Sequence, residues 1–202
     1  MPVTLDGDHI RLEPLSLDHV PDLATVGCDD RIWKLMLYGM IRNDADMRLW
    51  VEDLLRRQEQ GTDLPFVVIF KANGKAIGGT RYLEIQTEHR RLEIGGTWYG
   101  LDYQRTVVNT ECKYLLLKHA FETVGCIRVQ FKADIRNERS WRAIERIGAV
   151  REGILRNHYI LADGTYRDSV YYSILDSEWL KVKERLHLLM RREYESGHRY
   201  GS

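Results

Sequence analysis

The chain is poor in the residue types that cross-link a polypeptide or bind metal ions. Its 202 residues include only three cysteines, Cys28, Cys112 and Cys126. An odd number of cysteines without metal-ligand spacing argues against a disulfide framework and predicts reduced thiols. The seven histidines are scattered and form no H-x-x-H or H-x-x-x-H pair. We therefore expect no metal site.

Long apolar runs and an excess of one charge are also lacking. Lysine plus arginine number 30, aspartate plus glutamate number 30, and the formal net charge is zero. No overall field would therefore draw the chain to nucleic acid or to an anionic membrane. Residues 1–15 lack the apolar core of a signal peptide, and the run Phe66–Phe70 is far too short to cross a bilayer. We expect a cytoplasmic protein that binds its partners at a local site, with no nucleic-acid or membrane partner.

The chain does contain enough apolar material for a core, at 44% of its residues, and it has no linker rich in proline, glycine or serine. We therefore expect one domain over residues 1–202. The apolar periodicity predicts strands at 9–15, 66–71, 76–85, 92–100, 127–133, 150–160 and 166–175, and helices at 18–26, 46–60, 109–123, 137–147 and 177–195. Asn73-Gly74 and Asp163-Gly164 are expected hairpin turns. This order is typical of a mixed α+β fold with a mostly antiparallel sheet.

The segment Tyr103–Glu111, which reads YQRTVVNTE, lies between a predicted strand and the helix expected to begin with Asn109 as its N-cap. A turn from a strand into a helix presents unpaired backbone N–H groups and the positive end of the helix dipole, a combination that binds phosphate. Any helix after a strand has this geometry, so position alone leaves phosphate binding and an ordinary helix start both open. The absence of G-x-G-x-x-G and G-x-x-x-x-G-K-[ST] argues against a dinucleotide fold and a P-loop.

Three stretches of sequence carry a family resemblance. They are QRTVVNTE at the start of a long helix, the later NERSWRAIERIGAVREGILR, and YRDSVYYSILDSEW at the end of the last hairpin. Together with the order of elements, they resemble the GNAT superfamily of acetyl-CoA-dependent N-acetyltransferases, and within it the ribosomal-protein N-terminal acetyltransferase-like branch. The resemblance implies a twisted, mostly antiparallel sheet in a three-layer α/β/α arrangement. It also implies an enzyme that transfers an acetyl group from its cosubstrate acetyl-CoA to a primary amine.

In that family the phosphate loop reads R/Q-x-x-G-x-G/A, and the matching stretch here begins at Gln104. The resemblance implies that acetyl-CoA contacts the loop and the first helical turn, namely Gln104, Arg105, Thr106, Val107, Val108, Asn109 and Thr110. Val107 and Asn109 replace the family's small residues, and Val107 both restricts the backbone and adds bulk. A slightly widened loop and an impaired affinity for the cosubstrate are the two outcomes left open.

The resemblance also implies that the pantetheine arm pairs with the strand before the loop, at Thr97, Trp98 and Tyr99. Core packing is the alternative for the two aromatic side chains. Asn137 would orient the pantetheine, and Arg142 could meet the 3′-phosphate of CoA or an acidic substrate. The alternatives are a helix cap for Asn137 and a solvated charged face for Arg142.

Two residues are candidates for catalysis. Glu93, in the family pattern E-I-G, would be the general base that accepts the amine proton directly or through water; a solvated strand residue or a partner of Arg91 is the alternative. Many GNAT enzymes protonate the departing thiolate with a tyrosine, but residues 143–146 contain none. The family pattern N-x-x-S is present at 137–140, so the Ser140 hydroxyl would take that role, or it is an ordinary first-turn residue.

The acceptor would be bound by variable walls of the family fold, around Trp33 and Tyr38 in the first part of the chain and around His158 in the late hairpin. A protein N-terminus, an antibiotic and a small metabolite amine all stay open as acceptors, and so does a homodimer. A non-catalytic module that binds or senses acyl-CoA is the alternative function, and turnover of acetyl-CoA with a panel of amines distinguishes the two.

Overall fold

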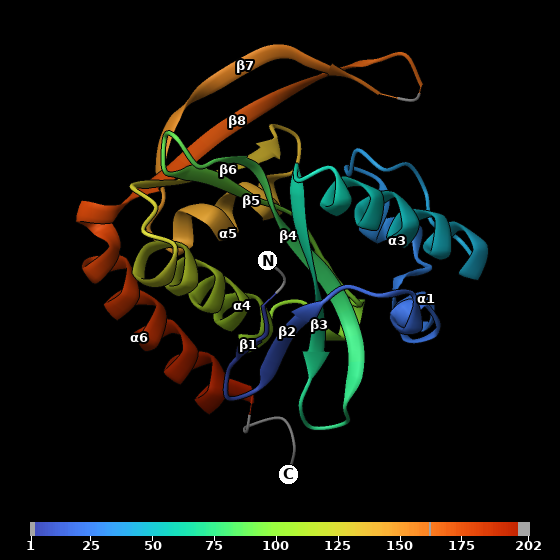
Figure 1. Ribbon diagram of the computed structural model, residues 1–202, viewed down its shortest axis with the longest axis horizontal. Coiled ribbons are helices and arrows are strands. Elements are labelled where there is room, and N and C mark those ends of the chain that lie inside the picture. Colours follow the sequence, from blue (N-terminus) through green and yellow to red (C-terminus); the bar gives the residue numbers. More distant parts are fainter. Residues whose placement is uncertain (1–2, 162, 198–202) are drawn as a thin grey trace.

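The computed structural model describes residues 3–161 and 163–197. Its strands are β1 (Leu5–Asp6), β2 (Ile10–Pro14), β3 (Asp63–Phe70), β4 (Lys75–Gln86), β5 (Arg91–Tyr99), β6 (Arg128–Asp134), β7 (Val150–Ile160) and β8 (Tyr166–Leu175). Its α-helices are α1 (Val20–Gly27), α2 (Asp30–Trp33), α3 (Asp44–Glu59), α4 (Val107–Lys118), α5 (Glu138–Arg146) and α6 (Trp179–Gly197). The expected order of strands and helices is confirmed, with the short β1 and α2 added (Figure 1).

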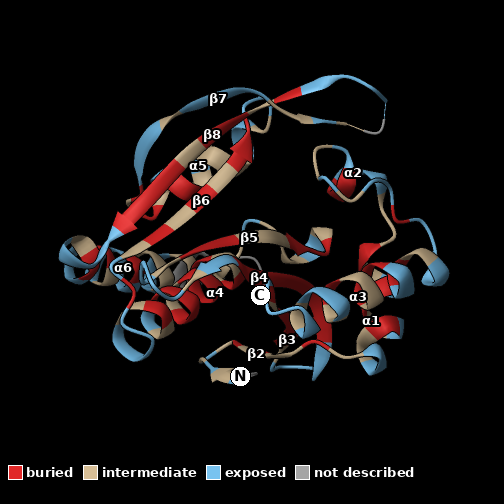
Figure 2. Ribbon diagram, turned by 45° about the horizontal axis from the view of Figure 1, so that its top comes forward, coloured by how far each residue is buried: buried red, intermediate tan, exposed pale blue. Residues whose placement is uncertain are grey.

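The strands form one sheet in the order β1-β2-β3-β4-β5-β6-β8-β7. Neighbours are antiparallel except β5 and β6, which run parallel and pair only from Arg91↔Arg128 to Glu93↔Gln130. Beyond Glu93 the two strands separate, because β6 continues with β8 as its partner while β5 stays on β4. Figure 2 shows β6 and β8 rising away from β5. The sheet is therefore split between β5 and β6 in the part beyond Glu93.

Helices cover both faces of the sheet and enclose two apolar clusters. One cluster joins α4, α5 and α6 to the sheet and includes Leu116, Ile144 and Leu186. The other joins α1, α2 and α3 to β3, β4 and β5. Among the described residues, this second cluster includes no side chain of β6, β7 or β8. On that face, the part of the sheet beyond β5 is left free for a site.

Local signals placed most of these elements, with one error at the start of α4. Asn137 caps α5 as expected, since its side chain accepts a hydrogen bond from the Ser140 N–H. The N-cap of α4 is Thr106 and not Asn109, because the Thr106 hydroxyl accepts from the Val108 N–H. The predicted cap was wrong because both residue types favour that position and the helix begins earlier than its apolar pattern suggests.

Candidate functional site

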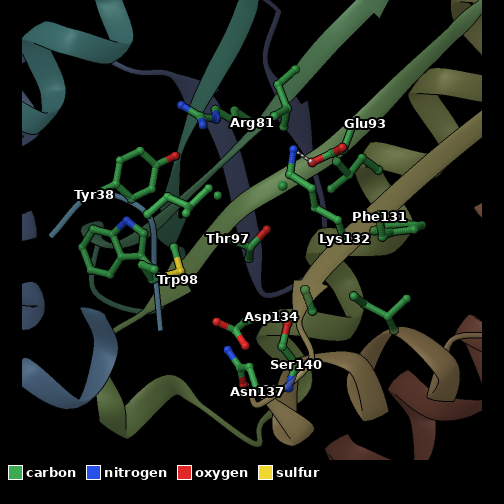
Figure 3. A pocket seen from close by; sticks show the side chains of 18 of the residues that line it. Tyr38, Arg81, Glu93, Thr97, Trp98, Phe131, Lys132, Asp134, Asn137 and Ser140 are labelled. Atoms are coloured by element: carbon green, nitrogen blue, oxygen red, sulfur yellow. Dashed lines mark hydrogen bonds and ion pairs between the residues drawn. The ribbon is translucent and has the colours of Figure 1, made fainter. Parts of the chain in front are cut away.

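The split between β5 and β6 opens into a cavity of about 1430 Å³. Its walls come from β5, β6, the loop before α4 and the first turns of α5, and residues 35–38 and 159–160 line it as well. Figure 3 shows Thr97 on one side of the split, with Asn137 and Ser140 on the other side. A cavity of this size exceeds the usual space for one small ligand, so it can hold a cosubstrate and an acceptor together.

A bulge in β5 shapes the edge of the cavity. Gly96 has φ +59°, and the register against β4 shifts between Gly79 and Arg81. A Cβ at Gly96 would lie 2.7 Å from the Tyr38 hydroxyl and 3.2 Å from Arg81 Nε. Glycine is therefore needed both for the backbone angle and for the space. The bulge also reverses the face of the sheet on which each side chain after Gly96 lies. Beyond Glu93, the edge of β5 that faces the cavity pairs with no described strand.

Thr97 lies at the centre of a polar cluster on the edge of β5. Its hydroxyl lies 2.8 Å from the Thr80 hydroxyl and accepts a hydrogen bond of 2.6 Å from Lys113 Nζ. Lys113 is buried on α4, where burial lowers its pKa. Lys113 was not predicted as a site residue, although it follows Asn109 by four residues and so lies on the same helix face. An ammonium group here has further N–H groups for a ligand.

The loop before α4 is held by its own side chains. Gln104 Nε2 donates to the Tyr99 carbonyl at 2.9 Å, and Gln104 Oε1 accepts from Arg139. Asn109 accepts from the Tyr99 hydroxyl at 3.3 Å. Of the residues expected to contact the cosubstrate here, Gln104, Arg105, Thr106 and Asn109 line the cavity.

The side chains of the other three expected contacts do not line the cavity. Val108 is packed in the core, and the buried Thr110 hydroxyl accepts from Arg146. Only the backbone of these two residues can face a ligand, because their side chains point inward from the first turn of α4. The side chain of Val107 also lies outside the lining, so its bulk does not occupy the cavity at the helix N-terminus.

The first turn of α5 forms the wall opposite Thr97. Asn137 and Ser140 both line the cavity, and the Ser140 hydroxyl makes no hydrogen bond to a described residue. That hydroxyl is therefore available to a ligand. Arg142 lines the cavity too, but it is exposed and donates to Glu138 at 2.6 Å, which matches the solvated charged face named as its alternative.

Glu93 lies where the two parallel strands part. It is 1% exposed, accepts from Gln130 Nε2 at 3.1 Å, and lies 3.3 Å from Lys132 Nζ. Burial raises the pKa of Glu93, while Lys132 and Gln130 oppose the shift. The alternatives of a solvated residue and of a partner for Arg91 are both wrong, since Arg91 donates to Gln86 instead. Glu93 is a buried carboxylate in the wall of the cavity.

The three residues expected to bind the acceptor take different places. Tyr38 lines the cavity, and burial raises its pKa to about 12. Trp33 does not line it, because its side chain is 1% exposed in the core and donates to the Gly27 carbonyl at 2.6 Å. His158 does not line it either; its ring packs against Tyr159, and Tyr159 lines the cavity instead.

The strands contribute three cationic side chains to the cavity that were not predicted as site residues: Arg81 on β4, Lys132 on β6 and Arg167 on β8. The alternation of β6 could have shown its polar face, since its apolar residues Val129 and Phe131 alternate with polar ones. Alternation does not say which strands lie side by side, and the clustering of the three cations depends on that order.

Two kinds of feature are absent from the part of the chain that the structure describes. It holds no group of three histidine, cysteine, aspartate or glutamate side chains arranged to bind a metal ion. Within residues 3–161 and 163–197, no helix combines the length and apolarity that crossing a membrane requires.

Comparison with known proteins identifies the family. The model of the acetyltransferase (GNAT) domain matches residues 9–150. A solved structure from T. thermophilus, assigned as an acetyltransferase, is 38% identical, with a TM-score of 0.84 over 93% of this chain and 97% of that chain. YdaF of Bacillus subtilis (strain 168), assigned as a ribosomal N-acetyltransferase, is 32% identical over 107 residues. These cover 53% of this chain and 57% of YdaF, so the match spans little more than half of that curated relative.

A more distant solved structure contains ligands. The microcin C7 self-immunity acetyltransferase MccE, in complex with acetyl-CoA and AMP, is 22% identical, with a TM-score of 0.73 over 84% of this chain and 93% of that chain. At this identity the likeness concerns the fold alone. The family match over residues 9–150, the near-complete structural matches and the split between β5 and β6 agree. The chain belongs to the GNAT acetyltransferase family.

Proposed function

We propose that this protein transfers an acetyl group from acetyl-CoA to a primary amine. The observation that carries the proposal is the free edge of β5 beyond Glu93, which leads directly to the N-terminus of α4 inside one cavity. A strand edge without a partner offers N–H and C=O groups to the amides of a pantetheine arm. The N-terminus of a helix offers N–H groups and a positive dipole to a pyrophosphate.

The residues of this cavity fit the cosubstrate. Thr97, Trp98 and Tyr99 would provide the strand edge, and the backbone from Gln104 to Asn109 would provide the phosphate site. Because the side chain of Val107 lies outside the lining, the absence of glycine there does not fill the site. Bound acetyl-CoA would supply a thioester, whose carbonyl carbon accepts the amine.

Side chains of this protein can provide the proton acceptor and the proton donor that the reaction needs. An amine must lose a proton to attack, and Glu93 can accept it directly or through water. The departing thiolate needs a proton or a hydrogen bond, which the free Ser140 hydroxyl can donate. The Lys113 ammonium contacts Thr97, on the side of the split opposite Ser140. It is a second group that could stabilise the same negative charge on sulfur.

The aspartate variant of Val107 tests the phosphate site. We expect Val107→Asp to weaken acetyl-CoA binding by about tenfold or more, because the new carboxylate, although outside the cavity lining, would add a negative charge to the N-terminus of α4, which is proposed to attract the pyrophosphate. Calorimetric titration measures this change. Val107→Asn has nearly the same shape without the charge and should bind close to wild type. Equal affinities of the aspartate variant and the wild type for acetyl-CoA would show that the pyrophosphate does not bind at this turn.

The alanine variant of Ser140 tests the thiolate contact. If the hydroxyl donates to sulfur as charge develops there, Ser140→Ala should lower kcat by roughly 5- to 150-fold, about 1–3 kcal/mol, and leave acetyl-CoA affinity nearly unchanged. Asn137→Ala is the control on the same turn: it should weaken cosubstrate binding and destabilise the fold by about 1 kcal/mol through loss of the cap. A wild-type kcat in Ser140→Ala would shift the role to Lys113 or to water.

Turnover with a panel of primary amines separates this proposal from a module that only binds acyl-CoA. An acetyltransferase releases CoA thiol in proportion to acetylated amine. Binding of acetyl-CoA without release of thiol for any amine of the panel would favour the binding module.

A further inference from the structure

We propose that the acceptor is a small amine that also carries a carboxylate or phosphate group, and that Arg167 binds this group, with Arg81 as a second guanidinium in the same cavity. The proposal rests on the proposed acetyl transfer and names the substrate class of the same site. Both residues are more than nine-tenths buried, both line the cavity, and neither guanidinium donates a hydrogen bond to a described residue. A buried charge without hydrogen bonds is costly unless a partner completes it.

The Arg167 guanidinium donates no hydrogen bond to another described residue. It is 5% exposed on β8, and its Nε lies 3.9 Å from Asp134 Oδ2, beyond hydrogen-bond distance. Asp134 already accepts from the N–H, Nε and Nη2 of Arg136, at 2.9, 3.0 and 2.7 Å. The Tyr159 ring centre lies 5.6 Å from the guanidinium carbon, a contact that leaves the N–H groups for a ligand. Burial lowers the pKa of Arg167, so the fold retains this cation at a cost.

Arg81 lines the same cavity from β4, which is separated from β8 by β5 and β6. It is 9% exposed on β4, and its Nε and Nη1 are buried without a hydrogen-bond partner. Nη1 lies 2.9 Å from Asp63 Oδ2, which compensates the charge, but the two atoms are not aligned for a hydrogen bond. The Tyr38 ring packs 5.2 Å from the guanidinium carbon. The Nε atom lies 3.2 Å from the position that a Cβ would take at Gly96, so the side chain packs against the β5 bulge.

The charges across the sheet fit an acceptor with a cationic and an anionic end. Glu93 lies on β5 between Arg81 on β4 and Arg167 on β8, with Lys132 on β6 as its neighbour. An amine that approaches Glu93 would have a guanidinium within the same cavity for an acidic group on the same molecule. Residues 35–38 and 159–160 line this cavity from two other segments, and Figure 2 shows the β7–β8 hairpin extending above β5 toward α2. An acceptor that carries both groups on one small molecule would place them within this single cavity.

Matched pairs of amines test the proposal. The pairs are an amino acid with its amide, and an amino-sugar phosphate with the unphosphorylated amino sugar; together they also separate carboxylate from phosphate. We expect kcat/KM to be about 10- to 100-fold higher for at least one acidic member than for its neutral partner. Arg167→Gln should remove this preference, because it should lower kcat/KM for the acidic member far more than for the neutral member. Arg156→Gln, at an exposed β7 residue outside the cavity lining, should retain it.

A binding measurement without acetyl transfer keeps this proposal separate from the proposed function. The acetylated forms of the same pairs are titrated into the protein in the absence of acetyl-CoA. We expect the acidic product to bind at least about tenfold more tightly than the neutral one, and Arg167→Gln to abolish the difference. Arg81→Lys keeps the pairing with Asp63 and should retain part of the difference.

Equal affinities for the acidic and neutral products, or an equal loss for both in Arg167→Gln, would overturn the assignment of the anionic group. A peptide amine acetylated faster than every acidic small amine would do the same. If acetyl-CoA binds but no amine is acetylated, the proposed function fails, and the product titration still decides whether the arginines bind an acid.

Discussion

Replacing Glu93 with glutamine is expected to lower kcat/KM for acetyl transfer by about 10²- to 10⁴-fold at pH 7, the usual range for loss of a general base. Glu93 is the buried carboxylate at the point where β5 and β6 part, and it lines the cavity. Gln130 and Lys132 hold its two oxygens in place. Glutamine retains the shape of the side chain but cannot accept the amine proton.

The pH profile distinguishes a base from a structural group. A base acts in its ionised form, so wild-type activity should fall as pH falls through the pKa of Glu93. Burial raises that pKa above 4.5, so the fall should begin at a higher pH than for an ordinary glutamate. The Glu93→Gln variant should lack this limb. Its deficit should shrink at alkaline pH, where the amine is already neutral.

Glu84→Gln is the matched control, because Glu84 lines the same cavity but is exposed. Its activity should stay within about twofold of wild type. Thermal unfolding of both variants reports any damage to the fold, which is expected to be small in Glu84→Gln. A deficit of Glu93→Gln that is equal at every pH would assign Glu93 to structure and not to proton transfer.

Gly78→Ala is expected to destabilise the protein by about 3 kcal/mol or more, at the upper end of the cost of overpacking. Gly78 lies on β4 opposite Tyr99. An added Cβ would overlap the Trp98 carbonyl oxygen and lie 2.9 Å from the Tyr99 Cα. Both atoms belong to the backbone of β5, so no side-chain rotation can relieve the overlap. The β5 edge would have to move, and acetyl-CoA binding should weaken as well.

Denaturant unfolding and calorimetric titration measure these two effects. Gly153→Ala, on β7, is the control, because a Cβ there meets no atom within 4 Å and its backbone is not left-handed. Its stability should stay within about 1 kcal/mol of wild type. A Gly78→Ala variant as stable as the wild type would show that β4 and β5 can separate at this point without loss.

The order of elements and several of their ends followed from the sequence, because these depend on neighbours along the chain. The hairpin that Asn73-Gly74 predicted does join β3 to β4, but its loop spans the four residues 71–74 and not two. Asn137 caps α5, and Gly148 takes a left-handed conformation with φ +103° after it. The family resemblance located the strand edge at Thr97 and the turn at Gln104, and both line the cavity.

What each side chain touches was decided by the tertiary structure. Trp33 and Tyr38 belong to one aromatic segment, yet only Tyr38 reaches the cavity, because Trp33 packs with Trp50 and Trp98 beneath it. The burial of Glu93 likewise depends on β6, which follows β5 only after a whole helix.

The positions of Arg81, Lys132 and Arg167 have the same origin. Apolar periodicity says which face of its own strand a residue takes, but it does not say which strands become neighbours. That order, β4-β5-β6-β8, results from competition among long-range pairings over the whole chain. The bulge at Gly96 adds a local reversal of faces that a two-residue period cannot represent. The sequence alone therefore located the edge that would bind the cosubstrate, and only the packed sheet brought together the charges that face the acceptor.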